Sequence, residues 1–121
     1  MDRAAWSERI KQASVDAGTY RPYFDSVIES LAGIMEKRDD AEAQFEAAGG
    51  ETITTHTTKT GQTNIVKNPA LVVIDDLNKT ALAYWRDLGL TPAGLKRINE
   101  TALKEKGNRS SFGDILKGLD I

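Results

Sequence analysis

The chain has 121 residues, no cysteine and a net charge of −2, and 40% of its residues are apolar. This length and apolar content predict a single domain with its own core. The lack of cysteine excludes disulfides, zinc–thiolate sites and thiol catalysis. No apolar run approaches the roughly 20 residues needed to cross a bilayer, and the start lacks a signal-peptide pattern. We therefore expect a cytoplasmic protein without a membrane partner.

The charge is unevenly distributed along the chain. Residues 20–51 carry three basic and eight acidic side chains, a net charge of −5, whereas residues 93–121 carry six basic and four acidic ones, a net charge of +2. Such asymmetry can mark a segment that binds a polyanion, but a mixed charged surface is the more common reason for it. Charge alone therefore does not indicate a nucleic-acid-binding protein.

The first helix is predicted over residues 2–17, where apolar side chains repeat at steps of three and four. Asp2 is the expected N-cap, and Gly18 supplies the left-handed stop. A longer helix over about residues 20–48 follows, and we expect Thr19 to cap it.

The second helix carries an apolar seam with the spacing of a coiled coil. Ile28 and Met35 widen this seam, so we expect the helix to pack on more than one neighbour. Arg38 interrupts it, either as a side chain that snorkels from the core edge or as a residue that sets register with an acidic partner. The seam residues are Tyr20, Phe24, Val27, Leu31, Ile34, Arg38, Ala41 and Phe45.

A threonine-rich insert over about residues 51–67 separates this helix from the next one. Residues 52–58 and 63–66 favour strands, and Lys59-Thr60-Gly61-Gln62 favours a glycine turn in which Gly61 has a positive φ. Two strands alone are marginally stable in water, so the hairpin must lie on its own helices or on a neighbouring subunit. Its polar outer face suits contacts with phosphate or protein, although a simple connector is the default interpretation.

The third helix is predicted to start at Asn68-Pro69, with asparagine as the cap and proline at the first helical position. Gly89 ends it, and Thr91-Pro92 starts a further helix over about 92–105. A capping box from Ser111 to Asp114 indicates a short terminal helix. The seam of the third helix consists of Ala70, Ile74, Leu77, Ala81, Tyr84 and Leu88.

These elements predict a mainly α fold. We expect a long antiparallel helical hairpin with a small β-hairpin insert at about 51–67 and short terminal helices. The chain divides into an N-terminal helix (1–18), a helical oligomerisation core with the β-hairpin (19–105), and a basic linker with a short C-terminal helix (106–121).

The sequence carries no pattern that predicts catalysis. His56 is the only histidine and lies on a threonine-rich strand, where it is most simply a solvated surface residue. Neighbours such as Asp39-Asp40 and Asp75-Asp76 point about 100° apart on a helix, so neither pair forms a carboxylate dyad or a metal cage. Phosphate-binding and dinucleotide-binding glycine motifs are absent from the sequence. We therefore expect no enzymatic activity, no cofactor and no metal.

Binding is better supported than catalysis. The stretch "LGLTPAGLKRI", residues 88–98, joins two helices by a tight turn and places Lys96 and Arg97 on the second one. A helix-turn-helix element presents basic side chains to DNA in this way, although many helical hairpins have the same pattern.

The combination of these motifs resembles the small terminase subunit of tailed double-stranded DNA phages. The resemblance is carried by "NIVKNPAL" after the predicted hairpin and by "YWRDLGLTPAGLKRI" at the end of the third helix. More narrowly, the chain resembles the branch of the family in which a hairpin between helices is followed by the KNPA and LGLTP motifs. Two upstream stretches are similar to this branch, "AAWSERIKQASVDAG" and "GTYRPYFDSVIESLAGIMEKRDDAEAQFEAAGG". The likeness extends from about residue 5 to residue 98.

The resemblance implies a packaging factor that is not an enzyme. Small terminase subunits form homo-oligomeric rings, recognise double-stranded phage DNA and regulate the large terminase subunit, which carries the ATPase and the nuclease. The implied location is the cytoplasm of the bacterial host of a phage or prophage. Two other functions stay open at this point, namely a helix-turn-helix transcription regulator and a coiled-coil adaptor that binds no nucleic acid.

Two sets of basic residues are candidates for DNA contact, and the apolar seams supply candidates for assembly. The densest basic set consists of Lys96, Arg97, Lys104, Lys106 and Arg109. The competing set, on the first helix, consists of Arg3, Arg9 and Lys11. The expected oligomerisation residues are Phe24, Val27, Leu31, Ile34, Phe45, Ile74, Leu77 and Tyr84.

Overall fold

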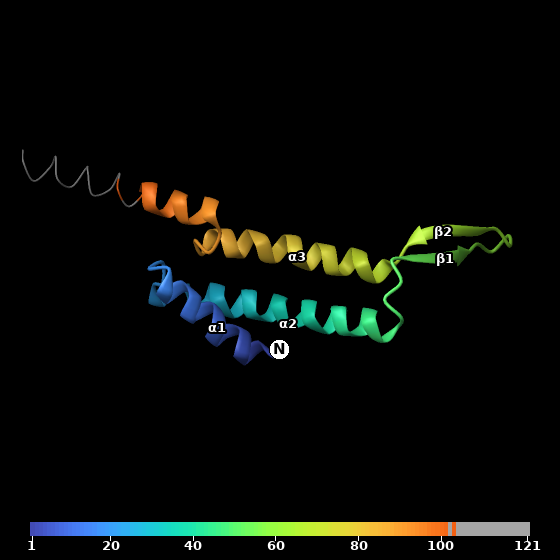
Figure 1. The fold of residues 1–121 in the computed structure, drawn as a ribbon, viewed down its shortest axis with the longest axis horizontal. Helices are drawn as coiled ribbons and strands as arrows, with labels where there is room; N and C mark the ends of the chain where they lie inside the picture. The colour runs from blue at the N-terminus through green and yellow to red at the C-terminus, as the bar shows by residue number, and fades with distance from the viewer. Residues whose placement is uncertain (102, 104–121) are drawn as a thin grey trace, which may run out of the picture.

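The computed structural model describes residues 1–101 and 103. Its elements are α1 (Arg3–Asp16), the 3-10 helix η1 (Pro22–Phe24), α2 (Asp25–Ala47), β1 (Ile53–Thr57), β2 (Thr63–Lys67) and α3 (Pro69–Asp87). A further helix occupies residues 92–101. α2 and α3 run antiparallel, α1 lies along α2, and the β-hairpin projects from one end (Figure 1). The predicted helical hairpin with a β-hairpin insert is therefore confirmed.

Part of the predicted chain organisation concerns residues near the C-terminus. The linker and the short helix predicted after residue 105 lie outside the described residues. The division of the chain into segments at residues 18 and 105 stays a prediction.

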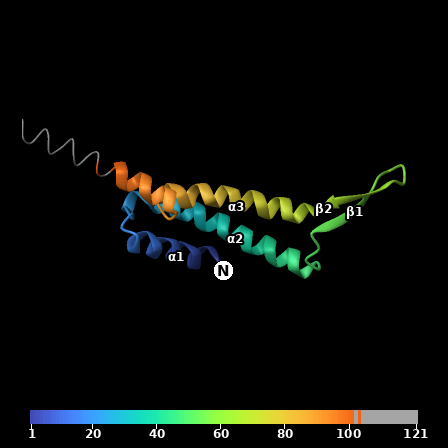
Figure 2. The ribbon, with the colours of Figure 1, turned by 45° about the horizontal axis from the view of Figure 1, so that its top comes forward.

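α2 forms the middle layer of the helical body. Figures 1 and 2 show it between α1 and α3 in both views, and α2 contacts both of these helices. This arrangement confirms that the second helix packs on more than one neighbour, as its wide apolar stripe predicted. The buried core consists of Trp6, Ile10, Ile28, Leu31, Ala32, Met35, Ala81 and Leu88.

Side-chain caps hold the predicted starts of three helices. The Asp2 carboxylate accepts a hydrogen bond from the Ala5 N–H, at 2.8 Å. Asn68 accepts from the Ala70 N–H at 3.0 Å, with proline next in the chain. The Thr91 hydroxyl accepts from the Gly94 N–H, also at 3.0 Å. Each cap satisfies a backbone donor that has no partner within the helix.

The predicted cap at Thr19 is wrong. Thr19 is buried, and its hydroxyl donates to the Ser14 carbonyl oxygen at the end of α1, at 3.4 Å. The chain enters α2 through η1, and Arg21 before it makes no side-chain cap. The second helix consequently starts later than residue 20, because Thr19 satisfies the end of the preceding helix instead of the start of the next.

The joint between α3 and the helix over 92–101 is tightly packed. Gly89 has a φ of +72°, which is the left-handed stop that the sequence predicted. A Cβ atom on Gly94 would lie 2.2 Å from the carbonyl oxygen of Arg86. Because only glycine lacks the Cβ atom that would clash here, the helix over 92–101 packs with its backbone directly against the end of α3.

Two glycine-to-alanine substitutions test this packing. Gly94→Ala should lower the free energy of unfolding by about 1–3 kcal/mol, because its methyl group would overlap a backbone atom. Gly33→Ala, in the middle of α2, should raise it by about 0.5–1 kcal/mol, because a Cβ there meets the Arg3 guanidinium at an ordinary 3.6 Å. Thermal unfolding followed by circular dichroism measures both. Equal effects of the two substitutions would contradict the close approach at Gly94.

The β-hairpin pairs its strands in an uninterrupted register from Ile53↔Lys67 to Thr57↔Thr63. Gly61 in the turn has a φ of +86°, as predicted. Figures 1 and 2 show the hairpin extending past the ends of α2 and α3, so it does not lie on its own helices. Support from a neighbouring subunit, the other possibility expected from the sequence, stays a prediction.

Contacts at its base set the direction of the hairpin. The Asn68 N–H donates to the Thr52 carbonyl oxygen at 3.0 Å, and the Asn68 amide group donates to the Glu51 carbonyl oxygen at 2.8 Å. The Lys67 ammonium group lies 2.6 Å from the Asp75 carboxylate on α3. The strands are therefore anchored to the start of α3 while the rest of the hairpin extends away from the body.

Candidate assembly and DNA-binding surfaces

One side of the α2–α3 pair is apolar and only partly buried. α1 packs against the side of α2 that carries Ile28, Ala32 and Met35. At about 100° per residue, a second row of apolar residues on α2 and α3 faces away from α1. We call this row the bare flank; it consists of Val27, Ile34, Ala41, Val73, Leu77 and Tyr84. It contains no charged side chain.

The bare flank continues to the base of the β-hairpin. A depression of about 300 Å³ lies there, between Ala41 and Phe45 on α2 and Ala70 and Val73 on α3. Val73 is 52% exposed although it is a large apolar residue. The apolar surface thus extends along most of the helical hairpin, which is the kind of surface that marks a protein contact.

The predicted oligomerisation residues divide into two groups. Leu31 is 0% exposed and Ile74 is also buried, so their apolar surface is used within the chain. The other six keep part of their surface exposed, and they are Phe24, Val27, Ile34, Phe45, Leu77 and Tyr84. Their role in assembly stays a prediction.

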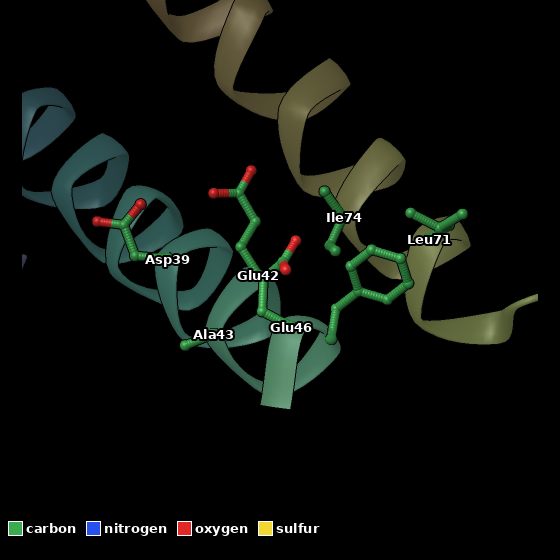
Figure 3. Close-up of a pocket in the computed structure, with 7 residues that line it drawn as sticks. Asp39, Glu42, Ala43, Glu46, Leu71 and Ile74 are labelled. Carbon is green, nitrogen blue, oxygen red and sulfur yellow. The ribbon is translucent and has the colours of Figure 1, made fainter. Parts of the chain in front are cut away.

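An acidic groove of about 630 Å³ lies between α2 and α3 near the hairpin. Figure 3 shows Asp39, Glu42 and Glu46 along α2, with Leu71 and Ile74 on α3 across the groove. No group of three acidic, histidine or cysteine side chains in the described part of the chain is arranged to hold a metal ion. The groove thus combines acidic side chains on α2 with an apolar wall on α3.

Asp39 connects α1 to α2 at the end of this groove. Its carboxylate accepts a hydrogen bond from the Trp6 indole N–H at 2.7 Å and one from Arg38 at 3.0 Å. The N-terminal ammonium group of Met1 lies 3.1 Å away. Burial by itself raises the pKa of Asp39, but the hydrogen bonds from Trp6, Arg38 and the N-terminus outweigh it and lower the pKa. Arg38 and Asp39 are neighbours on the same helix, so this pair sets no register with another element, and the two roles expected for Arg38 stay predictions.

Asp39→Asn tests this contact through its pH dependence. Because the folded state lowers the pKa, the carboxylate stabilises the fold above the unfolded pKa of about 4, and this stabilisation is lost as the pH falls through the folded value. At pH 7 the substitution should cost about 1 kcal/mol of unfolding free energy, and the cost should shrink at pH 3. Thermal unfolding at both values measures it. Asp40→Asn, at an exposed neighbouring position, is the control and should change little.

The basic residues expected to contact DNA lie partly within the described chain. Lys96 is 78% exposed and only loosely paired with Glu100, at 3.9 Å, and Arg97 is also exposed. The other three candidates, Lys104, Lys106 and Arg109, lie outside the described residues.

Arg21 is a basic neighbour of Arg97 that the sequence did not indicate. Both side chains line a depression of about 380 Å³ near the joint of α3 and the following helix. They are 76 positions apart (97 minus 21), so no local pattern could connect them. Asp87 also lines this depression, so its carboxylate offsets part of the positive charge of Arg21 and Arg97.

The competing basic residues on α1 do not form a cluster. The Arg3 guanidinium lies 3.5 Å from the Glu29 carboxylate, so its charge is paired. Arg9 lies over the Trp6 ring at 5.5 Å, and Lys11 lies over the Tyr20 ring at 5.1 Å. Since residues two positions apart on a helix point about 200° apart, these two cations face different sides.

The arrangement defines a class of protein before any comparison. It is a helical hairpin with one bare apolar side, a projecting β-hairpin and no metal cluster in its described part. Among the described residues, no helix is both long and apolar enough to span a membrane. These features define a mainly helical module with a partly exposed apolar side and a projecting β-hairpin.

Comparison with known families places the chain. A family model described as "Phage terminase, small subunit" matches residues 3–105. The match covers most of the 121 residues, and the chain belongs to this family. Searches of curated proteins and of solved structures found no match.

Proposed function

We propose that this small terminase subunit is the DNA-recognising and regulatory component of a phage genome-packaging motor. It acts in the cytoplasm of the bacterial host, together with the large subunit that carries the ATPase and the nuclease. The observation that carries the proposal is the family match over residues 3–105. It also sets aside a helix-turn-helix transcription regulator and a coiled-coil adaptor as the function of this chain.

The proposed role is not catalytic. His56, the only histidine of the sequence, is exposed on β1. The carboxylates of the acidic groove are spread along one helix and line an open apolar surface. Such groups do not supply the nucleophile, base and orienting residue that covalent catalysis needs. We assign hydrolysis of ATP and cleavage of DNA to the large subunit, because small terminase subunits are generally non-catalytic.

Assembly through the bare flank is part of the proposal. A charge-free apolar row along two helices is unfavourable in water and is stabilised when a second copy covers it. The opposite side of the helical hairpin holds α1 and the acidic groove, so the two sides of one chain differ. A contact between two different sides is heterologous, and it closes into a ring when the rotation between copies permits.

Two adjacent valines on α3 test the bare flank. Val73→Asp should break the assembly, because the contact would bury an unpaired charge, at a cost of several kcal/mol. Val72 is 47% exposed, close to the 52% of Val73, but points about 100° away on the helix. Val72→Asp should therefore leave the assembly intact. Light scattering gives the mass, and circular dichroism verifies folding. The same mass for both variants would rule out this surface.

DNA contact is proposed for the end of the molecule that carries Lys96 and Arg97. α2 has seven acidic and two basic side chains, a net charge of −5, and its side of the molecule repels phosphates. The helix over 92–101 has two basic residues and one acidic residue, and it leads to Lys104, Lys106 and Arg109. A few cations per chain bind DNA weakly, but symmetric repetition in an assembly adds their contacts together.

Two matched double substitutions compare the candidate surfaces. Lys96→Gln/Arg97→Gln and Arg9→Gln/Lys11→Gln each remove one lysine and one arginine. The first pair should weaken binding to double-stranded DNA and reduce the slope of log affinity against log salt by roughly 0.9 for each phosphate that the protein no longer neutralises. The second pair should change neither. Fluorescence anisotropy over a salt series measures both, after light scattering has shown an intact assembly.

The reverse result would assign DNA binding to α1.

A third variant, with Lys104, Lys106 and Arg109 changed to glutamine, tests the remainder of the set. It should lower the affinity and the salt slope further than the Lys96/Arg97 variant alone.

A further inference from the structure

The β-hairpin is exposed on both faces. Ile53 and Ile65 are 58% and 76% exposed, and every residue of β2 is exposed. Their side chains lie on the same face of the ribbon, because odd-numbered residues pair with odd-numbered ones in this register. A two-stranded ribbon without cover is marginally stable in water. The described residues supply no cover for these apolar side chains, which a partner would bury.

Among the described residues, the hydrogen bonds show which backbone groups of the hairpin have no partner. The Asn68 N–H donates to the Thr52 carbonyl oxygen at 3.0 Å, and the Thr58 N–H donates to the Gln62 carbonyl oxygen at 2.7 Å. Hydrogen-bonded and non-hydrogen-bonded residue pairs alternate in an antiparallel ladder. The backbone N–H and C=O groups of even-numbered residues therefore point to the partner strand of the same hairpin. The outward groups belong to residues 53, 55 and 57 on β1 and to residues 63, 65 and 67 on β2. Each edge thus offers three N–H donors and three carbonyl acceptors.

Neither edge has the devices by which proteins block strand pairing. Natural edge strands are protected by proline, bulges or charged side chains. β1 and β2 contain no proline, and their one-to-one register has no bulge. Lys67 is the only lysine or arginine on the two strands, and Asp75 on α3 binds its ammonium group. Lys59, the other lysine of the hairpin, lies in the turn rather than on a strand.

We propose that the hairpins of neighbouring copies pair edge to edge, with β1 of one copy antiparallel to β2 of the next. This inference rests on the assembly proposed above and adds a second contact to it. Copies related by rotation about one axis keep their hairpins in the same direction, which places unlike edges together in antiparallel orientation. Pairing of like edges by a two-fold axis would satisfy β1 and leave β2 open.

The side chains support a repeated contact of this kind. Edge pairing brings the odd-numbered faces of successive hairpins into one surface, so that Ile53 and Ile65 of neighbouring copies lie in a continuous row. Cross-strand contacts among β-branched residues stabilise such rows. The depression at Ala41 and Val73 ends at Asn68, at the base of the hairpin, so the proposed sheet is continuous with the bare flank.

Cysteine cross-linking tests the pairing, and the chain has no cysteine of its own. When unlike edges pair, even-numbered residues of two copies form the close, non-hydrogen-bonded pairs, with Cα atoms about 4.5 Å apart, within disulfide reach. A Thr54→Cys chain is co-expressed with an Asn64→Cys chain or a Val66→Cys chain. A disulfide-linked dimer should form in at least one mixture and in none of the three variants expressed alone.

Three outcomes would overturn the pairing. A cross-link in Thr54→Cys alone indicates that β1 pairs with β1. No cross-link in either mixture, with an intact oligomer by light scattering, shows that the hairpins stay apart while the proposed assembly stands. A monomeric wild-type protein overturns both proposals.

A proline scan gives an independent measurement. Thr55→Pro removes an outward N–H without removing a bond of the hairpin itself, and it should weaken assembly about tenfold per contact. Thr55→Val keeps the N–H and should assemble as the wild type does. Equal assembly of the two variants in a dilution series would contradict the proposal even if Val73→Asp confirms the bare flank.

Discussion

α2 buries Ile28, Leu31, Ala32 and Met35 over an arc of about 100° of its surface, and α1 and α3 depend on this arc for their place. α1 has 14 residues, a length at which an isolated helix is marginal in water. It is held by the burial of Trp6 and Ile10, each side chain contributing about 1.5–3 kcal/mol. Asp39 adds a directional contact through its bond with the Trp6 indole.

The packing of α1 on one side makes the helical hairpin asymmetric. One side of the α2–α3 pair is covered by α1 and bordered by the acidic groove, and the other is the bare flank. A chain with two different sides favours contacts that repeat in one direction. The two open edges of the hairpin also differ from each other, because one is formed by β1 and the other by β2. Contacts between them would likewise repeat in one direction. In the proposed assembly both surfaces lead to the same cyclic arrangement.

Most of the fold could be predicted because its signals are local. Asp2, Asn68 and Thr91 cap helices through hydrogen bonds that span two or three residues, and Gly61 adopts the positive φ that its turn requires. Thr19 failed as a cap because a buried carbonyl group of α1 competes for its hydroxyl. That competition depends on tertiary packing, which a local pattern does not contain.

The candidate surfaces were harder to predict for the same reason. The contact between Trp6 and Asp39 joins residues 33 positions apart, and Arg21 meets Arg97 only because two joints of the chain lie together. The apolar seam of α2 could be predicted from its spacing. The spacing does not show which of its residues are buried within the chain and which are left to contact a neighbour. Leu31 and Val27 have similar spacing, yet only Val27 keeps exposed surface.

Charge separates the two ends of the molecule. The acidic groove lies near the β-hairpin, between Asp39 and Leu71, whereas Lys96 and Arg97 lie on the helix that follows α3 at the opposite end (Figure 1). Repetition in the proposed ring strengthens both features, because like charges recur once in each copy. The end with the groove then repels DNA while the other attracts it. The proposed DNA contact and the proposed strand pairing thus lie at opposite ends of the chain, so that the hairpins can hold the copies together without occupying the proposed DNA surface.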